Sequence, residues 1–317
     1  MNTLTILSKS YFRIVLCLIL GILFSAVINS VDLPGVTDIP EPLANSCIQD
    51  PKKGTSNLTC EGITFKLNVP EVCMTKACGL IVDVHGWQMS SSLQNIHTNL
   101  SKLGEEAGFI VIHPNAKKTT YGRSWSDKDD KKVFAILSAV KNAFHVMENR
   151  VHITGFSQGG FMSWRFVCNY SSTIASAAPL AHGAGNYNRN TQPLTINIME
   201  DCFKGEQIDI LYGHGQKDGL AAYSGAIGTL KSILGNWSMN KKETLVDQPD
   251  YKRVRFTNDK GTQIEFINYN WVIKTKSMAN LGGHCFPGSG GYLGCGKDNE
   301  IHWGEEVIEF FLNHPKN

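Results

Sequence analysis

Residues 155–159 read Gly-Phe-Ser-Gln-Gly, so a serine stands between two glycines in a Gly-x-Ser-x-Gly motif. A β-prone stretch, residues 151–154, precedes the motif, and helix-forming residues 161–166 follow it. A strand, a sharp turn and a helix in this order are typical of a nucleophile elbow, which exposes the serine hydroxyl and requires small residues around the turn. The motif therefore predicts that Ser157 is a nucleophile.

A serine nucleophile needs a general base and an acidic residue that orients the base. Residues 208–212 predict a buried strand, and the loop that follows contains Asp218. Loops at the carboxyl ends of parallel strands commonly carry functional side chains, so we expect Asp218 to be the acid. A solvated turn aspartate is the structural alternative, because Asp-Gly is a common turn pair. Asp201 and Asp247 are rival candidates, although neither directly follows so clear a strand.

The base is expected after a last strand, which residues 263–269 predict by their alternation, with further β-prone residues at 271–273. His284 follows in a loop with glycines before it and a proline shortly after it. The later histidines, His302 and His314, are expected to open the final helix and to lie in the tail. We therefore predict His284 as the base.

The negative charge that develops on a carbonyl oxygen during attack needs preorganised hydrogen-bond donors. Residues 80–84 predict a buried strand, and His85-Gly86-Trp87 follow it upstream of the serine motif. We expect the backbone N–H groups of Trp87 and Gln158 to be these donors. A plain strand-ending turn is the alternative explanation of the His-Gly pair.

Taken together, these motifs resemble the secreted polyhydroxybutyrate depolymerase and feruloyl esterase group over residues 45–314. The matching segments are 83–87, 108–115, 124–125, 155–160, 214–218 and 282–288. The resemblance implies an α/β-hydrolase fold in which Ser157, Asp218 and His284 form a catalytic triad and Trp87 donates to the oxyanion. Many members of the group carry tryptophan where this chain has Phe286.

The resemblance implies a secreted serine esterase that hydrolyses polyesters or hydroxyalkanoate oligomers. Feruloyl or acetylxylan esterase activity on plant cell walls is the alternative, and a serine peptidase or a non-catalytic binding protein of the same fold stays open. An apolar substrate pocket is predicted from Trp87, Met89, Trp125 and Phe286, although each of them could equally be a core residue. The expected partner is an ester, which can be a small molecule, an oligomer or a polymer.

Predicted strands alternate with helical segments, the clearest of which have apolar residues spaced by three and four at 133–147 and 303–312. This alternation predicts a mainly parallel sheet with helices on both faces, in a single catalytic domain over residues 46–317. Residues 1–30 read as a secretory signal peptide, and residues 31–45 as an extended proline-rich leader. An uncleaved membrane anchor is the alternative to a cleaved signal.

Eight of the nine cysteines follow the signal peptide, and an even number in a secreted chain predicts disulfides. Although 105 connectivities are possible, local spacing favours the pairs Cys47–Cys60, Cys73–Cys78 and Cys285–Cys295, which leaves Cys168 and Cys202 as a long-range pair. Four Asn-x-Ser/Thr sequons start at Asn57, Asn99, Asn169 and Asn236 and are candidate glycosylation sites.

The formal net charge is +2, which gives no electrostatic reason to expect nucleic acid or an anionic membrane surface as a partner. We expect no stable membrane association once the signal is cleaved. Neither C-x-x-C nor H-E-x-x-H occurs in the sequence, so no metal site is predicted. The predicted chemistry requires no cofactor.

Overall fold

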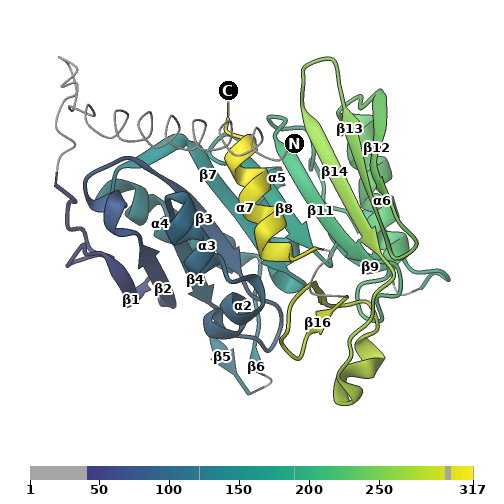
Figure 1. Cartoon of the computed structure of the whole chain (residues 1–317), viewed down its shortest axis with the longest axis horizontal. Coiled ribbons are helices and arrows are strands. Elements are labelled where there is room, and N and C mark those ends of the chain that lie inside the picture. The colour runs from purple at the N-terminus through teal and green to yellow at the C-terminus, as the bar shows by residue number, and fades with distance from the viewer. Residues whose placement is uncertain (1–40, 121, 189, 297–300, 317) are drawn as a thin grey trace, which may run out of the picture. The chain divides into compact units, whose positions relative to one another are not determined.

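The computed structural model describes residues 41–120, 122–188, 190–296 and 301–316 (Figure 1). Residues Ile39–Asn317 belong to one compact unit. The predicted signal peptide, and the predicted leader up to residue 40, lie outside the described residues, so both stay predictions. Within the described ranges, no helix is both long enough and apolar enough to cross a bilayer.

Within the described chain, one large sheet of ten strands forms the centre of this unit (Figure 1). From β4 through β14 the neighbouring strands run parallel, and antiparallel strands extend the sheet on both sides. The spatial order is β1 (Gly54–Cys60), β2 (Ile63–Val69), β4 (Phe109–Asn115), β3 (Cys78–Val84), β7 (Val146–Phe156), β8 (Ser176–Leu180), β11 (Asp209–Gly215), β14 (Gln263–Tyr269), β13 (Tyr251–Thr257) and β12 (Lys241–Asp247).

Helices cover both faces of this sheet, as the alternation of elements predicted. In Figure 1, α2 (Ser91–Thr98), α3 (Leu100–Ala107) and α7 (Trp303–Asn313) lie in front of the sheet. The elements α4 (Lys128–Ala143), α5 (Gln158–Asn169) and α6 (Tyr223–Asn236) pack on the other side. Two apolar clusters result, one on each face of the sheet.

The central strand β3 shows why both faces must be covered. All seven of its residues are buried. Leu80 and Val82 belong to the cluster that contains α4 and α5, whereas Ile81 between them belongs to the cluster that contains α3 and α7. Successive side chains of a strand point to opposite faces, so a continuous apolar run needs a helix layer on each side.

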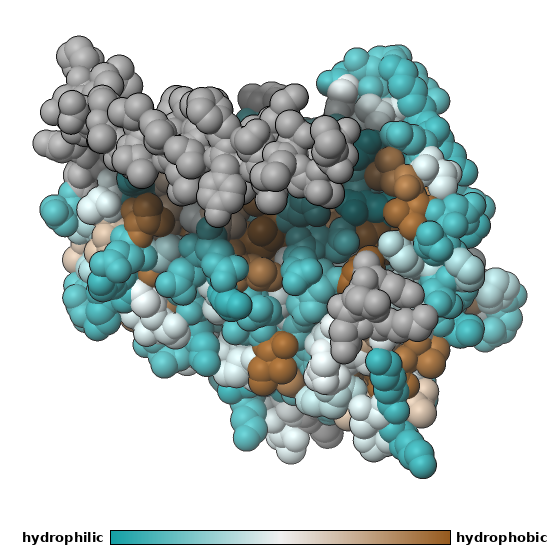
Figure 2. Space-filling model, viewed as in Figure 1, coloured by the Kyte–Doolittle hydropathy of each residue, from teal (hydrophilic) through white to brown (hydrophobic). Residues whose placement is uncertain are grey.

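Most of the surface coloured in Figure 2 is hydrophilic, and apolar side chains gather there in separate patches.

Short elements complete the described chain. Three two-stranded sheets lie outside the large one. They pair β5 (Lys118–Thr119) with β6 (Gly122–Arg123), β9 (Gly185–Asn188) with β10 (Thr195–Ile198), and β15 (Phe286–Pro287) with β16 (Gly294–Cys295); two 3₁₀ helices span Glu71–Met74 and Lys276–Leu281.

Two element boundaries differ from the sequence prediction. The helix predicted over residues 133–147 ends at Ala143, because Phe144 adopts an extended conformation and Met147 already belongs to β7. Apolar spacing continued through the end of the helix into the next strand, so periodicity alone could not separate the two elements. Residues 271–273 form no strand; Ile273 makes only an isolated bridge with Cys295.

The structure contains four disulfides with the pairing that local spacing favoured. Two of them brace the amino-terminal part of the sheet: Cys47–Cys60 and Cys73–Cys78. The other two, Cys168–Cys202 and Cys285–Cys295, fasten the end of α5 and the loop after His284.

Candidate active site

Ser157 occupies a strained turn between β7 and α5, with φ +56° and ψ −118°. A β-carbon at Gly159 would lie 1.9 Å from the carbonyl oxygen of Val84, and one at Gly155 would lie 2.5 Å from the backbone of Gly159. Only glycine fits at these two positions. A non-glycine residue with this backbone conformation costs energy, and such strain is concentrated at functional sites.

Asp218 lies in the loop after β11, and its carboxylate is completely buried. One oxygen, Oδ2, accepts a hydrogen bond from Nδ1 of His284 at 2.8 Å. The other, Oδ1, accepts the backbone N–H groups of Leu220 and Ala221 at 2.8 and 2.7 Å. Burial raises the pKa of Asp218. The charge of His284 and its hydrogen bond to the carboxylate lower the pKa, with a further contribution from the charge of His214, and together they outweigh burial. The net pKa is below the ordinary value, so the carboxylate is ionised and fixes the imidazole.

The loops that carry Asp218 and His284 contact each other directly. Asp218 and Gly282 form an isolated bridge, and the N–H of Gly283 donates to the carbonyl of Lys217 at 2.8 Å. Gly282 has φ +57°, and a β-carbon there would lie 2.2 Å from the same carbonyl. The glycines that precede His284 therefore allow the close approach that sets the distance between His284 and Asp218.

Ser157 and His284 both line a cavity of about 240 Å³, which we call the catalytic pocket. Its wall is mainly apolar, and at its mouth the side chains of Trp87, Leu220 and Tyr292 are exposed. The remaining lining residues are Gln88, Met89, Phe156, Met278, Leu281 and Leu293. The predicted pocket residues Trp87 and Met89 thus lie beside the serine.

The two predicted oxyanion donors lie next to the serine in the fold. Trp87 follows β3 and lines the catalytic pocket, and Gln158 is the first residue of α5. Within the described structure, neither backbone N–H has a hydrogen-bond acceptor, whereas the neighbouring N–H of Gln88 donates to Arg123 at 2.8 Å. Unpaired donors that the fold holds in place are what a developing oxyanion needs.

The sequence prediction gave no role to His85, which the structure places under the Trp87 turn. Its Nδ1 lies 2.7 Å from the carbonyl oxygen of Gly86, and its Nε2 accepts the N–H of Ala116 at 3.0 Å. Burial lowers the pKa of His85 to about 4, so the ring is neutral. Because Nε2 accepts from Ala116, Nδ1 carries the ring proton and donates to the carbonyl oxygen of Gly86, which fixes one tautomer. In the sequence, the His-Gly pair was the signal for this contact.

The two other predicted pocket residues do not line the catalytic pocket. Phe286 is fully buried, stacked on Phe156 at 4.1 Å and on His97 at 4.6 Å. The expectation that Phe286 lines the substrate pocket is therefore corrected: Phe286 packs behind Phe156, whose side chain lines that pocket. Trp125 is also buried, and it lines a second cavity.

The rival acids and bases lie elsewhere. Asp201 and Asp247 form exposed ion pairs with Lys204 and Lys252. His302 is the N-cap residue of α7, as expected. His314 does not lie free in the tail: it is buried and its Nδ1 pairs with Asp209 at 2.7 Å.

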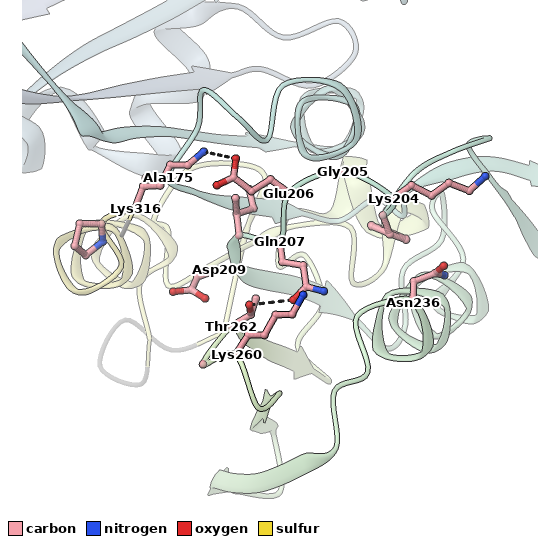
Figure 3. A pocket seen from close by; sticks show the side chains of 14 residues that line it. Ala175, Lys204, Gly205, Glu206, Gln207, Asp209, Asn236, Lys260, Thr262 and Lys316 are labelled. Atoms are coloured by element: carbon pink, nitrogen blue, oxygen red, sulfur yellow. Dashed lines mark hydrogen bonds and ion pairs between the residues drawn. The ribbon is translucent and has the colours of Figure 1, made fainter.

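Two larger cavities lie outside the catalytic pocket. One, of about 750 Å³, includes Trp125 and Gln158 in its wall. The other, of about 700 Å³, lies at the amino ends of β8, β11 and β14, where Glu206 pairs with Lys316 and Thr262 donates to Gln207 (Figure 3). In the part of the chain that the structure describes, no three His, Cys, Asp or Glu side chains are grouped to hold a metal ion.

No protein-family model matches the chain. Over 212 residues the chain is 24% identical to a bifunctional acetylxylan esterase/xylanase of Neocallimastix patriciarum, an alignment that covers 64% of this chain and 29% of that protein. Over 224 residues it is 22% identical to probable feruloyl esterase C of Aspergillus clavatus, covering 68% of this chain and 76% of that protein. The chain therefore spans less than a third of the length of the first of these relatives.

Among solved structures, the acetyl xylan esterase from Aspergillus awamori superposes with a TM-score of 0.57 at 16% identity, covering 81% of this chain and 98% of that one. At this identity the superposition bears on the fold. Together with the parallel sheet, the helices on both faces and the serine turn after β7, it confirms the predicted α/β-hydrolase fold.

Proposed function

We propose that the protein is a serine esterase that hydrolyses carboxylic esters through a covalent acyl-enzyme. The proposal depends chiefly on one observation: Asp218 holds Nδ1 of His284 at 2.8 Å while His284 and Ser157 line one pocket. A carboxylate bonded to Nδ1 leaves Nε2 as the basic nitrogen, which is the arrangement that activates a serine hydroxyl.

In the proposed reaction, Ser157 attacks the ester carbonyl and His284 takes the proton of the hydroxyl. The N–H groups of Trp87 and Gln158 bind the oxygen that becomes negative. His284 then returns the proton to the departing alcohol, and water repeats the sequence on the acyl-enzyme. Asp218 keeps the imidazole in the required tautomer and stabilises its protonated form.

Esters of plant cell-wall polysaccharides are the substrate class that we favour. The relatives named above are described as an acetylxylan esterase and a feruloyl esterase, which supports the alternative raised from the sequence over polyester hydrolysis. The catalytic pocket, at about 240 Å³ and mainly apolar, has room for a small acyl group. We also propose that the protein is secreted, since four disulfides are typical of proteins from oxidising compartments.

The decisive experiment compares purified protein and its Ser157→Ala variant on p-nitrophenyl acetate, acetylated xylan, methyl ferulate and polyhydroxybutyrate film. We expect the unmodified protein to hydrolyse one or both of the cell-wall esters and the variant to lose at least about a thousandfold in kcat. The thermal midpoint should change little, since alanine removes only the hydroxyl of a partly exposed side chain.

A fluorophosphonate probe tests the same serine without reference to a substrate. We expect the probe to label the protein at Ser157 and to leave the Ser157→Ala variant unlabelled. Equal turnover by both proteins would reject Ser157 as the nucleophile. Absence of both labelling and hydrolysis in the unmodified protein would favour a non-catalytic binding protein, and cleavage of peptides alone would favour a peptidase.

A further inference from the structure

The cavity of about 750 Å³ and the catalytic pocket are lined by consecutive residues of the chain. Ser157 lines the catalytic pocket, and Gln158 lines the larger cavity. We call the larger one the side cavity. Its other lining residues are Trp125, Asp127, Phe161, Arg165, His182, Asn186, Tyr187 and Met199. Its volume is within the roughly 300–1,000 Å³ of small-molecule sites.

The side-cavity residue next to Ser157 in the chain, Gln158, is held in place by hydrogen bonds. Trp125 donates its backbone N–H to the side-chain oxygen of Gln158 at 3.1 Å, and Ser124 bonds the same amide. The indole N–H of Trp125 donates to the carbonyl of His85 at 2.9 Å. The side chains of Gln158 and Trp125 are therefore held in place without a ligand.

Another part of the wall contains packed aromatic and imidazole rings. Phe161 of α5 stacks on His182 at 4.7 Å, and His182 meets Tyr187 edge-on at 5.3 Å. The guanidinium of Arg165 lies 4.7 Å from the centre of the Phe161 ring, and Asp130 holds it through two bonds of 2.6 and 2.7 Å. A disulfide between the end of α5 and residue 202 fastens the segment after Met199 to the same helix.

The side cavity therefore differs in chemistry from the catalytic pocket. It combines aromatic faces with a carboxylate from Asp127, a guanidinium from Arg165 and amides from Gln158 and Asn186. A sugar ring has an apolar C–H face and a rim of hydroxyls that both donate and accept. Aromatic rings with a few polar groups at their edges match both parts of such a ligand.

We propose that the side cavity binds sugar rings of the carbohydrate whose acyl ester is held at Ser157. This inference rests on the proposed esterase function and adds to it a site for the alcohol part of the substrate. The apolar catalytic pocket then takes the acyl group, and the carbohydrate extends past Gln158 into the side cavity. A large acyl group in the side cavity is the competing arrangement, which its charged groups make unfavourable unless the acyl group offers polar partners.

Asn186 is the position for the test, because its side chain is exposed and lines the side cavity on the short strand β9. Asn186→Trp places a large ring in the cavity. Asn190→Trp is the matched control, since Asn190 is exposed on the same hairpin connection and is not part of the cavity wall. Phe161→Ala is a second variant that removes an aromatic face instead of filling the space.

The readout is the ratio of kcat/KM for an acetylated xylo-oligosaccharide to kcat/KM for p-nitrophenyl acetate, which is too small to reach the side cavity. We expect Asn186→Trp and Phe161→Ala to lower this ratio by about tenfold, equivalent to about 1.4 kcal/mol, and Asn190→Trp to leave it unchanged. Thermal midpoints show whether each variant is folded.

Binding is measured separately by titrating an unesterified xylo-oligosaccharide into the Ser157→Ala variant, with and without Asn186→Trp. Binding that disappears with Asn186→Trp supports the proposal. An unchanged ratio in the folded Asn186→Trp variant would overturn the proposal. A loss of kcat/KM confined to methyl ferulate would also overturn it, because it would assign the side cavity to the acyl group. Neither result affects the esterase proposal, which is tested separately by ester hydrolysis and by the Ser157→Ala variant.

Discussion

Two carboxylate–imidazole pairs stand at opposite ends of strand β11. At its carboxyl end Asp218 bonds His284 at 2.8 Å, and at its amino end Asp209 bonds His314 at 2.7 Å. The two distances are nearly equal, and in each pair the histidine lies far downstream of the aspartate. By this geometry alone, both pairs could orient a general base.

Their surroundings separate them. Around Asp218 and His284 lie a serine in a strained turn and backbone donors that have no acceptor among the described residues. Asp209 lines a cavity in which some polar side chains pair with one another, as Figure 3 shows for Glu206 with Lys316. That cavity is larger than the catalytic pocket. Polar groups that are already paired offer no free donor to a developing charge, whereas catalysis needs unpaired groups held in place.

The sharpest test of this comparison replaces each aspartate in turn with asparagine. Asp218→Asn should lower kcat on p-nitrophenyl acetate by about 10³–10⁴, because the amide no longer stabilises the tautomer and the charge that the base requires. Asp209→Asn should keep kcat and lower the free energy of unfolding by about 1–2 kcal/mol through the weakened bond to His314. Steady-state kinetics and urea unfolding measure the two effects. Similar losses of kcat in both variants would remove the distinction between the pairs.

The next effect separates disulfides near to and far from the catalytic pocket. Replacing both Cys285 and Cys295 with alanine opens a loop with a sequence separation of 10 residues. Replacing both Cys47 and Cys60 with alanine opens a loop with a separation of 13 residues. Each double variant should lose about 3 kcal/mol of unfolding free energy in the chain-entropy model. Only the first pair holds the loop that follows His284, so we expect its loss to lower kcat/KM as well. If the folded variants show equal kcat/KM, the loop does not need the crosslink for catalysis.

The smallest effect concerns buried histidines that bond a hydroxyl instead of a carboxylate. Nδ1 of His152 lies 2.8 Å from Oγ of Ser176, and Nδ1 of His97 lies 2.8 Å from Oγ of Ser289. Burial lowers the pKa of His152 to about 3, with smaller contributions from the charges of Arg150 and His314. Burial likewise lowers the pKa of His97 to about 4.

Both histidines are neutral in the folded protein and bind a proton more readily in the unfolded chain. As the pH falls from about 6.5 towards 4, each should therefore reduce the free energy of unfolding by up to about 1.4 kcal/mol per pH unit. Urea unfolding at a series of pH values should show a smaller slope for His152→Phe than for the unmodified protein. Equal slopes would mean that His152 is protonated in the folded state.

Much of the architecture could be predicted from local sequence. The Gly-x-Ser-x-Gly turn places Ser157 after β7 because only glycine fits at 155 and 159, and this is a constraint between near neighbours. The strands before Trp87 and Asp218 were visible as short apolar runs bounded by turn residues. The end of α4 was not, since apolar periodicity carried on into β7.

Residue type and spacing alone indicated the strands and helices around the serine motif, and the three side chains proposed as nucleophile, acid and base. Only the tertiary structure decided which contacts those side chains make. It buried Phe286, gave His314 a carboxylate partner, and placed the neighbouring residues Ser157 and Gln158 in the walls of different cavities. The physical reason is range: turn sterics and apolar period act within a few residues, whereas burial, pairing and cavity shape depend on segments that meet only when the sheet and its helices pack together.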